Sequence, residues 1–77
     1  MDRAMVERHL QQAREHVAAG EMHLARQRQI LTELTNRGAD VTEAKRLLMN
    51  FEESQIMHLA HVDRLKAELL AWPRGAA

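Results

Sequence analysis

Five histidines are the residues of this chain whose type and spacing could support chemistry. His9, His16 and His23 recur at intervals of seven, so on a helix they form one line along one face. His58 and His61 are three residues apart, which places them on neighbouring turns of a helix. Neutral imidazoles are common ligands of zinc, copper and nickel, and helical bundles hold such sites between facing helices. A metal site is therefore one hypothesis for these histidines.

The boundary of a helix bundle is the other interpretation, and we prefer it. An imidazole at such a position packs one edge on apolar neighbours while its other edge stays in water. The chain has no His-x-x-x-His pair and no Glu-x-x-His motif of the kind found in di-iron bundles. We therefore expect no cofactor and no metal, with His16, His58 and His61 as weak metal candidates. Protonation of the same row would charge it in mildly acidic solution, so a pH-responsive bundle is a related hypothesis.

The residues and motifs that other kinds of catalysis require are absent from the sequence. The chain contains no cysteine, which excludes disulfides, thiolate nucleophiles and cysteine-based zinc or iron–sulfur sites. Its three glycines are isolated, so no glycine-rich phosphate loop occurs. Ser54 is the only serine and has no nucleophile-elbow motif around it. We predict that the protein is not an enzyme and has no catalytic residues.

The composition is typical of an all-α protein. Apolar residues make up 45% of the 77 residues, but they are mainly Leu, Ala, Met and Val, with one Phe, one Trp and no Tyr. Good helix formers dominate, and the residues that favour strands are scarce. Eleven basic and eleven acidic side chains give a formal net charge of zero, which argues against nucleic-acid binding. No signal region or long apolar run occurs, which indicates a cytoplasmic protein without a membrane partner.

Two long helices are predicted to position the histidines, one over residues about 3–36 and one over about 41–71. The first begins after Asp2, which is a suitable N-cap. A proline follows the second helix and disfavours a helical residue before it, and we expect residues 73–77 to form a flexible tail. The whole chain, residues 1–77, is then one helical-hairpin domain.

The predicted turn at residues 37–40 carries its own signals. Gly38 stands where a helix commonly ends in a left-handed residue, and a Schellman motif there would pair the following residue with Leu34. Asp40 and Glu43 predict a capping box at the start of the second helix. Because the linker is this short, the two helices must be antiparallel neighbours.

Each predicted helix carries an apolar seam at alternating spacings of three and four residues, the heptad pattern of a coiled coil. Folding the chain at the turn brings residues whose numbers sum to roughly 75 opposite each other, so Val17 faces His58 and Gly20 faces Gln55. We interpret Gly20, Gln27 and Gln55, which interrupt the seams, as residues that set the register. The predicted core and interface residues are Val6, Leu10, Ala13, Val17, Gly20, Leu24, Leu31, Leu34, Leu48, Phe51, Gln55, Val62, Leu65 and Leu69.

The same register predicts where the histidines meet. His16 should lie near His58 and His61, so that three imidazoles converge at one level of the hairpin. A cluster of this kind is what a metal-responsive or proton-responsive bundle requires.

A single hairpin leaves large apolar side chains outside its seams. Two helices bury only one narrow stripe each, and a core this small seldom supplies more than ~3–5 kcal/mol. We therefore predict a homodimer, most simply a four-helix bundle, with a helix of another protein as the alternative partner. The apolar residues outside the seams are Met5, Ile30, Leu47, Met49, Ile56, Met57, Leu59 and Leu70.

Three stretches of the chain resemble a group of short, uncharacterised, α-helical proteins from rhizobia-like α-proteobacteria. They are residues 20–28 (GEMHLARQR), 38–44 (GADVTEA) and 47–52 (LLMNFE), within a similarity that runs from about Val6 to Leu69. The resemblance implies a small bacterial helical protein, and it brings no activity and no catalytic residue to this chain.

These observations favour a non-enzymatic helical protein that acts by interaction or oligomerisation. The alternative is a metal- or pH-responsive helical bundle that uses the histidine cluster. The biological role and the identity of any partner do not follow from the sequence.

Overall fold

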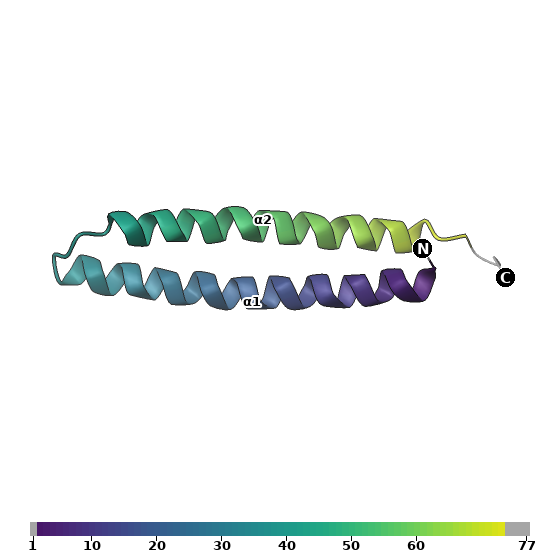
Figure 1. The fold of residues 1–77 in the computed structure, drawn as a ribbon, viewed down its shortest axis with the longest axis horizontal. Helices are drawn as coiled ribbons and strands as arrows, with labels where there is room; N and C mark the ends of the chain where they lie inside the picture. Colours follow the sequence, from purple (N-terminus) through teal and green to yellow (C-terminus); the bar gives the residue numbers. More distant parts are fainter. Residues whose placement is uncertain (1, 74–77) are drawn as a thin grey trace.

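The computed structural model describes residues 2–73 and consists of two antiparallel helices (Figure 1). Helix α1 spans Arg3–Asn36 and helix α2 spans Thr42–Leu70. They lie side by side along their length in a rod with extents of 63 × 15 × 14 Å. The all-α antiparallel hairpin expected from the sequence is confirmed. Most of the predicted tail, residues 74–77, lies outside the described residues.

The turn closes α1 with the expected Schellman motif. Gly38 adopts a left-handed conformation, with a φ of 69°. Its N–H donates to the carbonyl of Thr35 at 3.0 Å, and the N–H of Ala39 donates to the carbonyl of Leu34, also at 3.0 Å. These two bonds satisfy carbonyls that the helix end would otherwise leave without a partner.

The predicted capping box at the start of α2 is wrong. Val41 is the N-cap residue, and its side chain makes no capping hydrogen bond. The carboxylate of Asp40, one residue earlier, accepts from the backbone N–H of Thr42 at 3.0 Å and from its hydroxyl at 2.7 Å. Glu43 pairs instead with Arg46 at 2.6 Å. Asp40 thus forms a local turn that satisfies the N–H of the first residue of α2, without the return bond from Glu43 that a capping box requires.

The outer end of the hairpin, opposite the turn, is held by one cap and one aromatic side chain. The carboxylate of Asp2 accepts from the backbone N–H of Met5 at 2.7 Å, as expected of an N-cap. Helix α2 ends at Leu70, one residue before the predicted end. Trp72 then lies half-buried against the core at that end of the rod.

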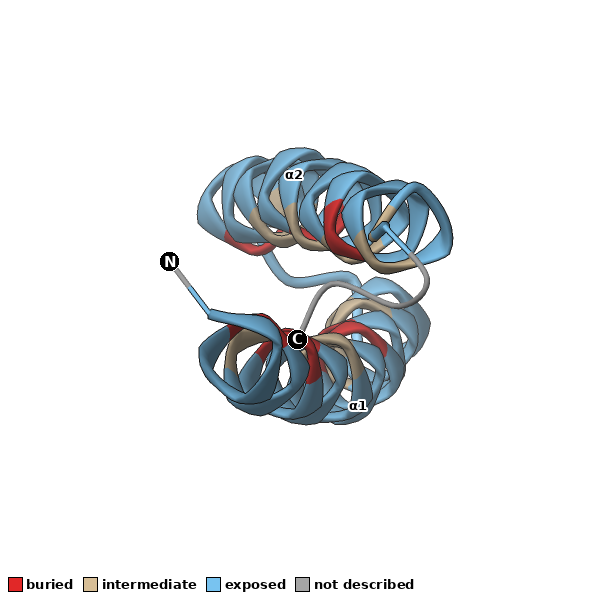
Figure 2. Cartoon of the chain, turned by 90° about the vertical axis from the view of Figure 1, so that its right-hand side faces the viewer, coloured by how far each residue is buried: buried red, intermediate tan, exposed pale blue. Residues whose placement is uncertain are grey.

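The interior is a single stripe between the helices, and the outer surfaces of both are exposed (Figure 2). None of the fourteen residues expected in the core or interface is exposed. Val6, Leu10, Ala13 and Leu65 form the buried cluster at the outer end, and Val6 is completely covered. Because the fourteen expected residues stay at least half-buried along the whole hairpin, the helices must keep a coiled-coil repeat and wind slightly around each other.

Two glutamine side chains tie the helices together at fixed levels. Gln27 of α1 donates from Nε2 to the carbonyl of Ala44 at 3.0 Å. Gln55 of α2 donates from Nε2 to the carbonyl of Val17 at 2.9 Å. Within the described residues, these two are the hydrogen bonds by which a side chain of one helix reaches the other helix. One is donated by α1 and the other by α2. Such directional contacts are what a residue that sets helix register must make.

Candidate functional site

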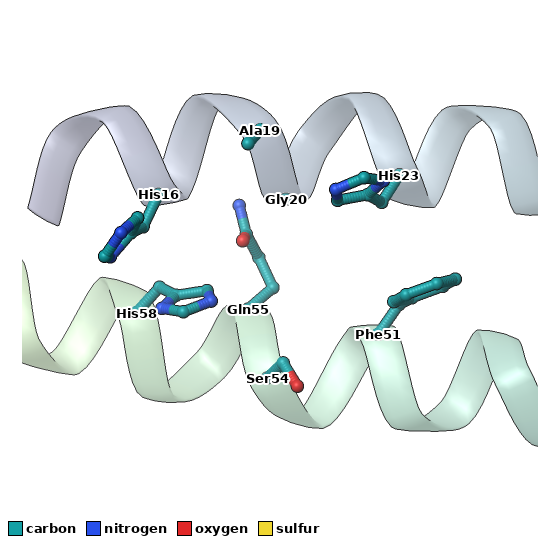
Figure 3. A pocket seen from close by; sticks show the side chains of 8 residues that line it. All are labelled: His16, Ala19, Gly20, His23, Phe51, Ser54, Gln55 and His58. Atoms are coloured by element: carbon teal, nitrogen blue, oxygen red, sulfur yellow. The ribbon is translucent and has the colours of Figure 1, made fainter.

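The middle of the hairpin carries a hollow of about 320 Å³ between the helices (Figure 3). We call it the central groove. Its lining comes from two consecutive turns of each helix, and most of the side chains are small or aromatic. The lining residues are His16, Ala19, Gly20, His23, Phe51, Ser54, Gln55 and His58.

Two ring pairs mark the ends of the central groove (Figure 3). At one end the rings of His16 and His58 have centroids 5.5 Å apart and are tilted by 47°. At the other end His23 stacks on Phe51, with centroids 5.6 Å apart and planes 15° apart. Each pair joins one helix to the other. Gly20 lies between the two pairs, and the amide of Gln55 reaches into the space that its missing side chain leaves.

The floor of the groove is the contact between Gln55 and Gly20. A Cβ atom added to Gly20 would lie 1.8 Å from Oε1 of Gln55, so the amide oxygen occupies the space where a side chain would begin. That oxygen is buried and has no hydrogen-bond partner within the described residues. It rests against the Cα of the glycine, whose C–H is at best a weak donor. The glycine is therefore required by its neighbour, since its own backbone is ordinary helix.

The three histidines singled out as metal candidates do not converge. His61 is exposed, and its Nδ1 lies 3.2 Å from a guanidinium nitrogen of Arg64. His58 points into the seam, and His61, three residues further on, is rotated by about 60° away from it around the helix axis. In the part of the chain that the structure describes, no group of three or more His, Cys, Asp or Glu side chains could hold a metal ion. The pair His16–His58 remains.

Two flanks with different chemistry run along the hairpin on either side of the seams. Residues seven apart share a flank, because seven residues make about two helical turns. The flank that carries the central groove is the histidine face, formed by His9, His16, His23 and Ile30 of α1 and Leu47, Ser54, His61 and Glu68 of α2. The opposite flank is the charged face, formed by Glu7, Arg14, Glu21, Arg28 and Thr35 of α1 and Lys45, Glu52, Leu59 and Lys66 of α2.

Charge separates the two flanks sharply. With histidine neutral, Glu68 is the one formally charged residue of the histidine face, whereas Thr35 and Leu59 are the only uncharged residues of the charged face. The central groove likewise has no formally charged residue in its lining. The hollow on the charged face, of about 370 Å³, includes both Glu21 and Arg28.

Burial separates the flanks as well. Among the residues of the two flanks, His9 and Ile30 are half-buried and the others are exposed, and both belong to the histidine face. The two helices therefore cover more of each other's side chains on this side. The row of histidines was identified from the sequence, but this asymmetry was not predicted. The signal was present in the sequence, because the residues of one flank are nearly all charged and those of the other are nearly all uncharged.

A membrane-spanning role finds no support in the described helices, since neither has an apolar stretch long enough to cross a bilayer. Comparison with known proteins adds no relative. No family model matches the chain, and no match is found among curated proteins or solved structures. The resemblance to short bacterial helical proteins accordingly stays a prediction.

Proposed function

We propose that this protein is a non-enzymatic interaction protein whose hairpin pairs with a second copy to make a four-helix bundle. The observation that carries this proposal is the excess of exposed surface. The hairpin exposes 6045 Å², whereas a compact monomer of 8.9 kDa is expected to expose about 4,800 Å². The excess of about 1,200 Å² is larger than the ~800 Å² that each partner buries in an interface of standard size.

The exposed surface includes large apolar side chains. Met22, Ile56, Met57 and Leu70 are 74%, 67%, 71% and 87% exposed. A single apolar residue in water is ordinary, but several on a rod this thin are typical of a surface that meets a partner.

The core of one hairpin is correspondingly small. Within the described residues, six apolar side chains are buried. Two of them, Ala13 and Ala44, contribute only a methyl group each. A stripe of this size is expected to leave a single hairpin marginally stable. Packing two hairpins together would add a second layer of contacts to each helix, as in other four-helix bundles.

Sedimentation velocity together with light scattering tests the proposal. We expect a species of twice the 8.9 kDa chain mass at micromolar concentration. The thermal midpoint should rise with protein concentration, because a dimer that dissociates on unfolding is stabilised by mass action. A monomer with a stable, cooperative and concentration-independent melt would refute self-association. A monomer with a weak melt would point to a helix of another protein as the partner.

A metal- or proton-responsive bundle is the second candidate, and the His16–His58 pair favours it. Two imidazoles on one tetrahedral zinc, at Zn–N distances of ~2.0–2.1 Å, hold their ring centres roughly 5 Å apart. The observed separation of 5.5 Å is close to that value. The site would need further ligands from water or from a second copy, because His61 does not join the pair.

Thermal melts with and without zinc or nickel test the second candidate, with His61→Ala as the control for His58→Ala. Metal binding by the pair predicts a midpoint that rises with metal in the parent chain and in His61→Ala but not in His58→Ala. Equal midpoints in all conditions reject the metal site. Dimer dissociation that is unchanged between about pH 5 and pH 8 rejects the proton response.

A further inference from the structure

We infer that the second copy covers the histidine face, so that the central groove lies inside the dimer and the charged face stays in water. This inference rests on the proposed self-association and names the surface responsible for it. Three observations carry it, which are the charge of the two flanks, the shape of the groove and the area of one face.

Charge favours the histidine face because formal charges are depleted from the centres of interfaces and are costly to desolvate without a partner. Covering the charged face would desolvate seven formally charged side chains. Of these, Glu7 is the one with a salt bridge in the described residues, to Arg3 at 3.2 Å. Of the residues that form the histidine face, only Glu68, near one end of the rod, has a formal charge, and Arg64 borders this face at a second hollow.

The same property explains why the partner is a second copy. In a two-fold symmetric dimer, one surface meets itself, so every charge on it is duplicated across the interface. A nearly neutral face can meet itself without opposing like charges. Neutral imidazoles also carry both a donor and an acceptor, which allows one histidine to bond another.

The shape of the groove suits an inserted side chain. The central groove shares Ser54 and His58 with a second hollow of about 440 Å³ that extends along α2 to Arg64. The two hollows therefore adjoin each other, and the exposed Met57 lines the second one. In helical bundles, large side chains of one helix pair pack into hollows of another.

The area of one face is sufficient. The two helices are roughly 45–50 Å long at 1.5 Å per residue, so with a width of 15 Å one side presents roughly 700 Å², which is close to the ~800 Å² that each partner of a standard interface contributes. A single face therefore accounts for most of the excess surface. The other flank need not be covered.

Two neighbouring alanines provide a matched test. Ala19 lines the central groove, whereas Ala18 follows the seam residue Val17 and lies toward the charged face. Both are exposed and both are central in α1, so glutamate at either position has the same effect on helix propensity. We expect Ala19→Glu to raise the dimer dissociation constant roughly tenfold or more, and Ala18→Glu to leave it within about threefold. Circular dichroism checks that both variants remain helical.

The outcomes are distinct. Dissociation by Ala18→Glu with Ala19→Glu unaffected would place the interface on the charged face, and an unchanged dimer in both variants would exclude the histidine face. A parent chain that is monomeric would refute the proposed function itself. Because the chain contains no cysteine, Ala19→Cys and Ala18→Cys offer a second readout by maleimide labelling. Labelling of Ala19→Cys should slow as dimer forms, and that of Ala18→Cys should not; equal rates at all concentrations overturn the inference.

Discussion

The amide oxygen of Gln55 lies where the side chain of Gly20 would begin, 1.8 Å from an ideal Cβ. The same amide donates to the carbonyl of Val17 at 2.9 Å. One side chain thus both holds the two helices at a fixed level and demands a glycine in the middle of a 34-residue helix. Glycine at such a position ordinarily weakens a helix by about 1 kcal/mol relative to alanine.

Gly20→Ala should therefore destabilise the protein, in opposition to its helix propensity. The new methyl group forces the buried amide of Gln55 to move and to give up its bond to Val17. We expect a loss of about 1–3 kcal/mol in the free energy of unfolding, measured by urea denaturation. In a Gln55→Ala background the space is free, so the same substitution should stabilise. A double-mutant cycle without this change of sign would contradict the contact.

The two cross-helix glutamines should differ when each is replaced by leucine. Gln55 carries a buried amide oxygen without a partner, so Gln55→Leu removes an unfavourable group along with one hydrogen bond. Gln27 bonds to Ala44 at 3.0 Å and has no buried polar atom left without a partner. We expect Gln27→Leu to cost about 1 kcal/mol more than Gln55→Leu in unfolding free energy. Equal costs would mean that the oxygen of Gln55 finds a partner in solution.

Gly38 is the glycine whose own backbone requires it. Its φ of 69° is left-handed, and no atom lies within 4 Å of an added Cβ, so a substitution meets strain without a clash. Gly38→Ala should cost about 1–2 kcal/mol in thermal or urea unfolding. Gly38→Asn should cost less, because asparagine tolerates the left-handed region. If the two variants lost the same amount, the Schellman turn would not be the source of the cost.

Asp40 should add a pH dependence to stability at acid pH. Its hydrogen bonds from the backbone and the side chain of Thr42 lower the pKa of the carboxyl below its usual 3.8. Since the folded pKa lies below the unfolded one, the stabilisation is complete above the unfolded pKa and disappears as pH falls through the folded pKa. Asp40→Asn should remove this component, so the stability difference between parent and variant should shrink as the pH falls from about 5 to 2. A constant difference over that range would show that the carboxylate is not bonded in the folded chain.

Much of this fold follows from local chemistry along the chain. The heptad spacing of Val6, Leu10 and Ala13 predicts a buried seam, and Gly38 with Leu34 predicts the Schellman turn that reverses the chain. Once the turn is placed, antiparallel geometry fixes which residues meet, and Gly20 does lie against Gln55. These features were predictable because each depends on residues a few positions apart plus one chain reversal.

The tertiary structure decided what depends on rotation about the helix axis and on atoms from both helices. His61 was expected to join His16 and His58 in one cluster, but the described residues hold no group of three such ligands, and its Nδ1 lies 3.2 Å from a guanidinium nitrogen of Arg64. Asp40 and Glu43 were expected to form a capping box, but Asp40 bonds Thr42, the first residue of α2, and Glu43 pairs with Arg46. The oxygen of Gln55 and the different coverage of the two flanks likewise arise only when the helices pack, whereas the pair His16–His58 was expected from the register and is confirmed. Periodicity in a sequence determines which face of a helix is buried, whereas contacts that join two helices depend on their relative rotation, which only the packed hairpin defines.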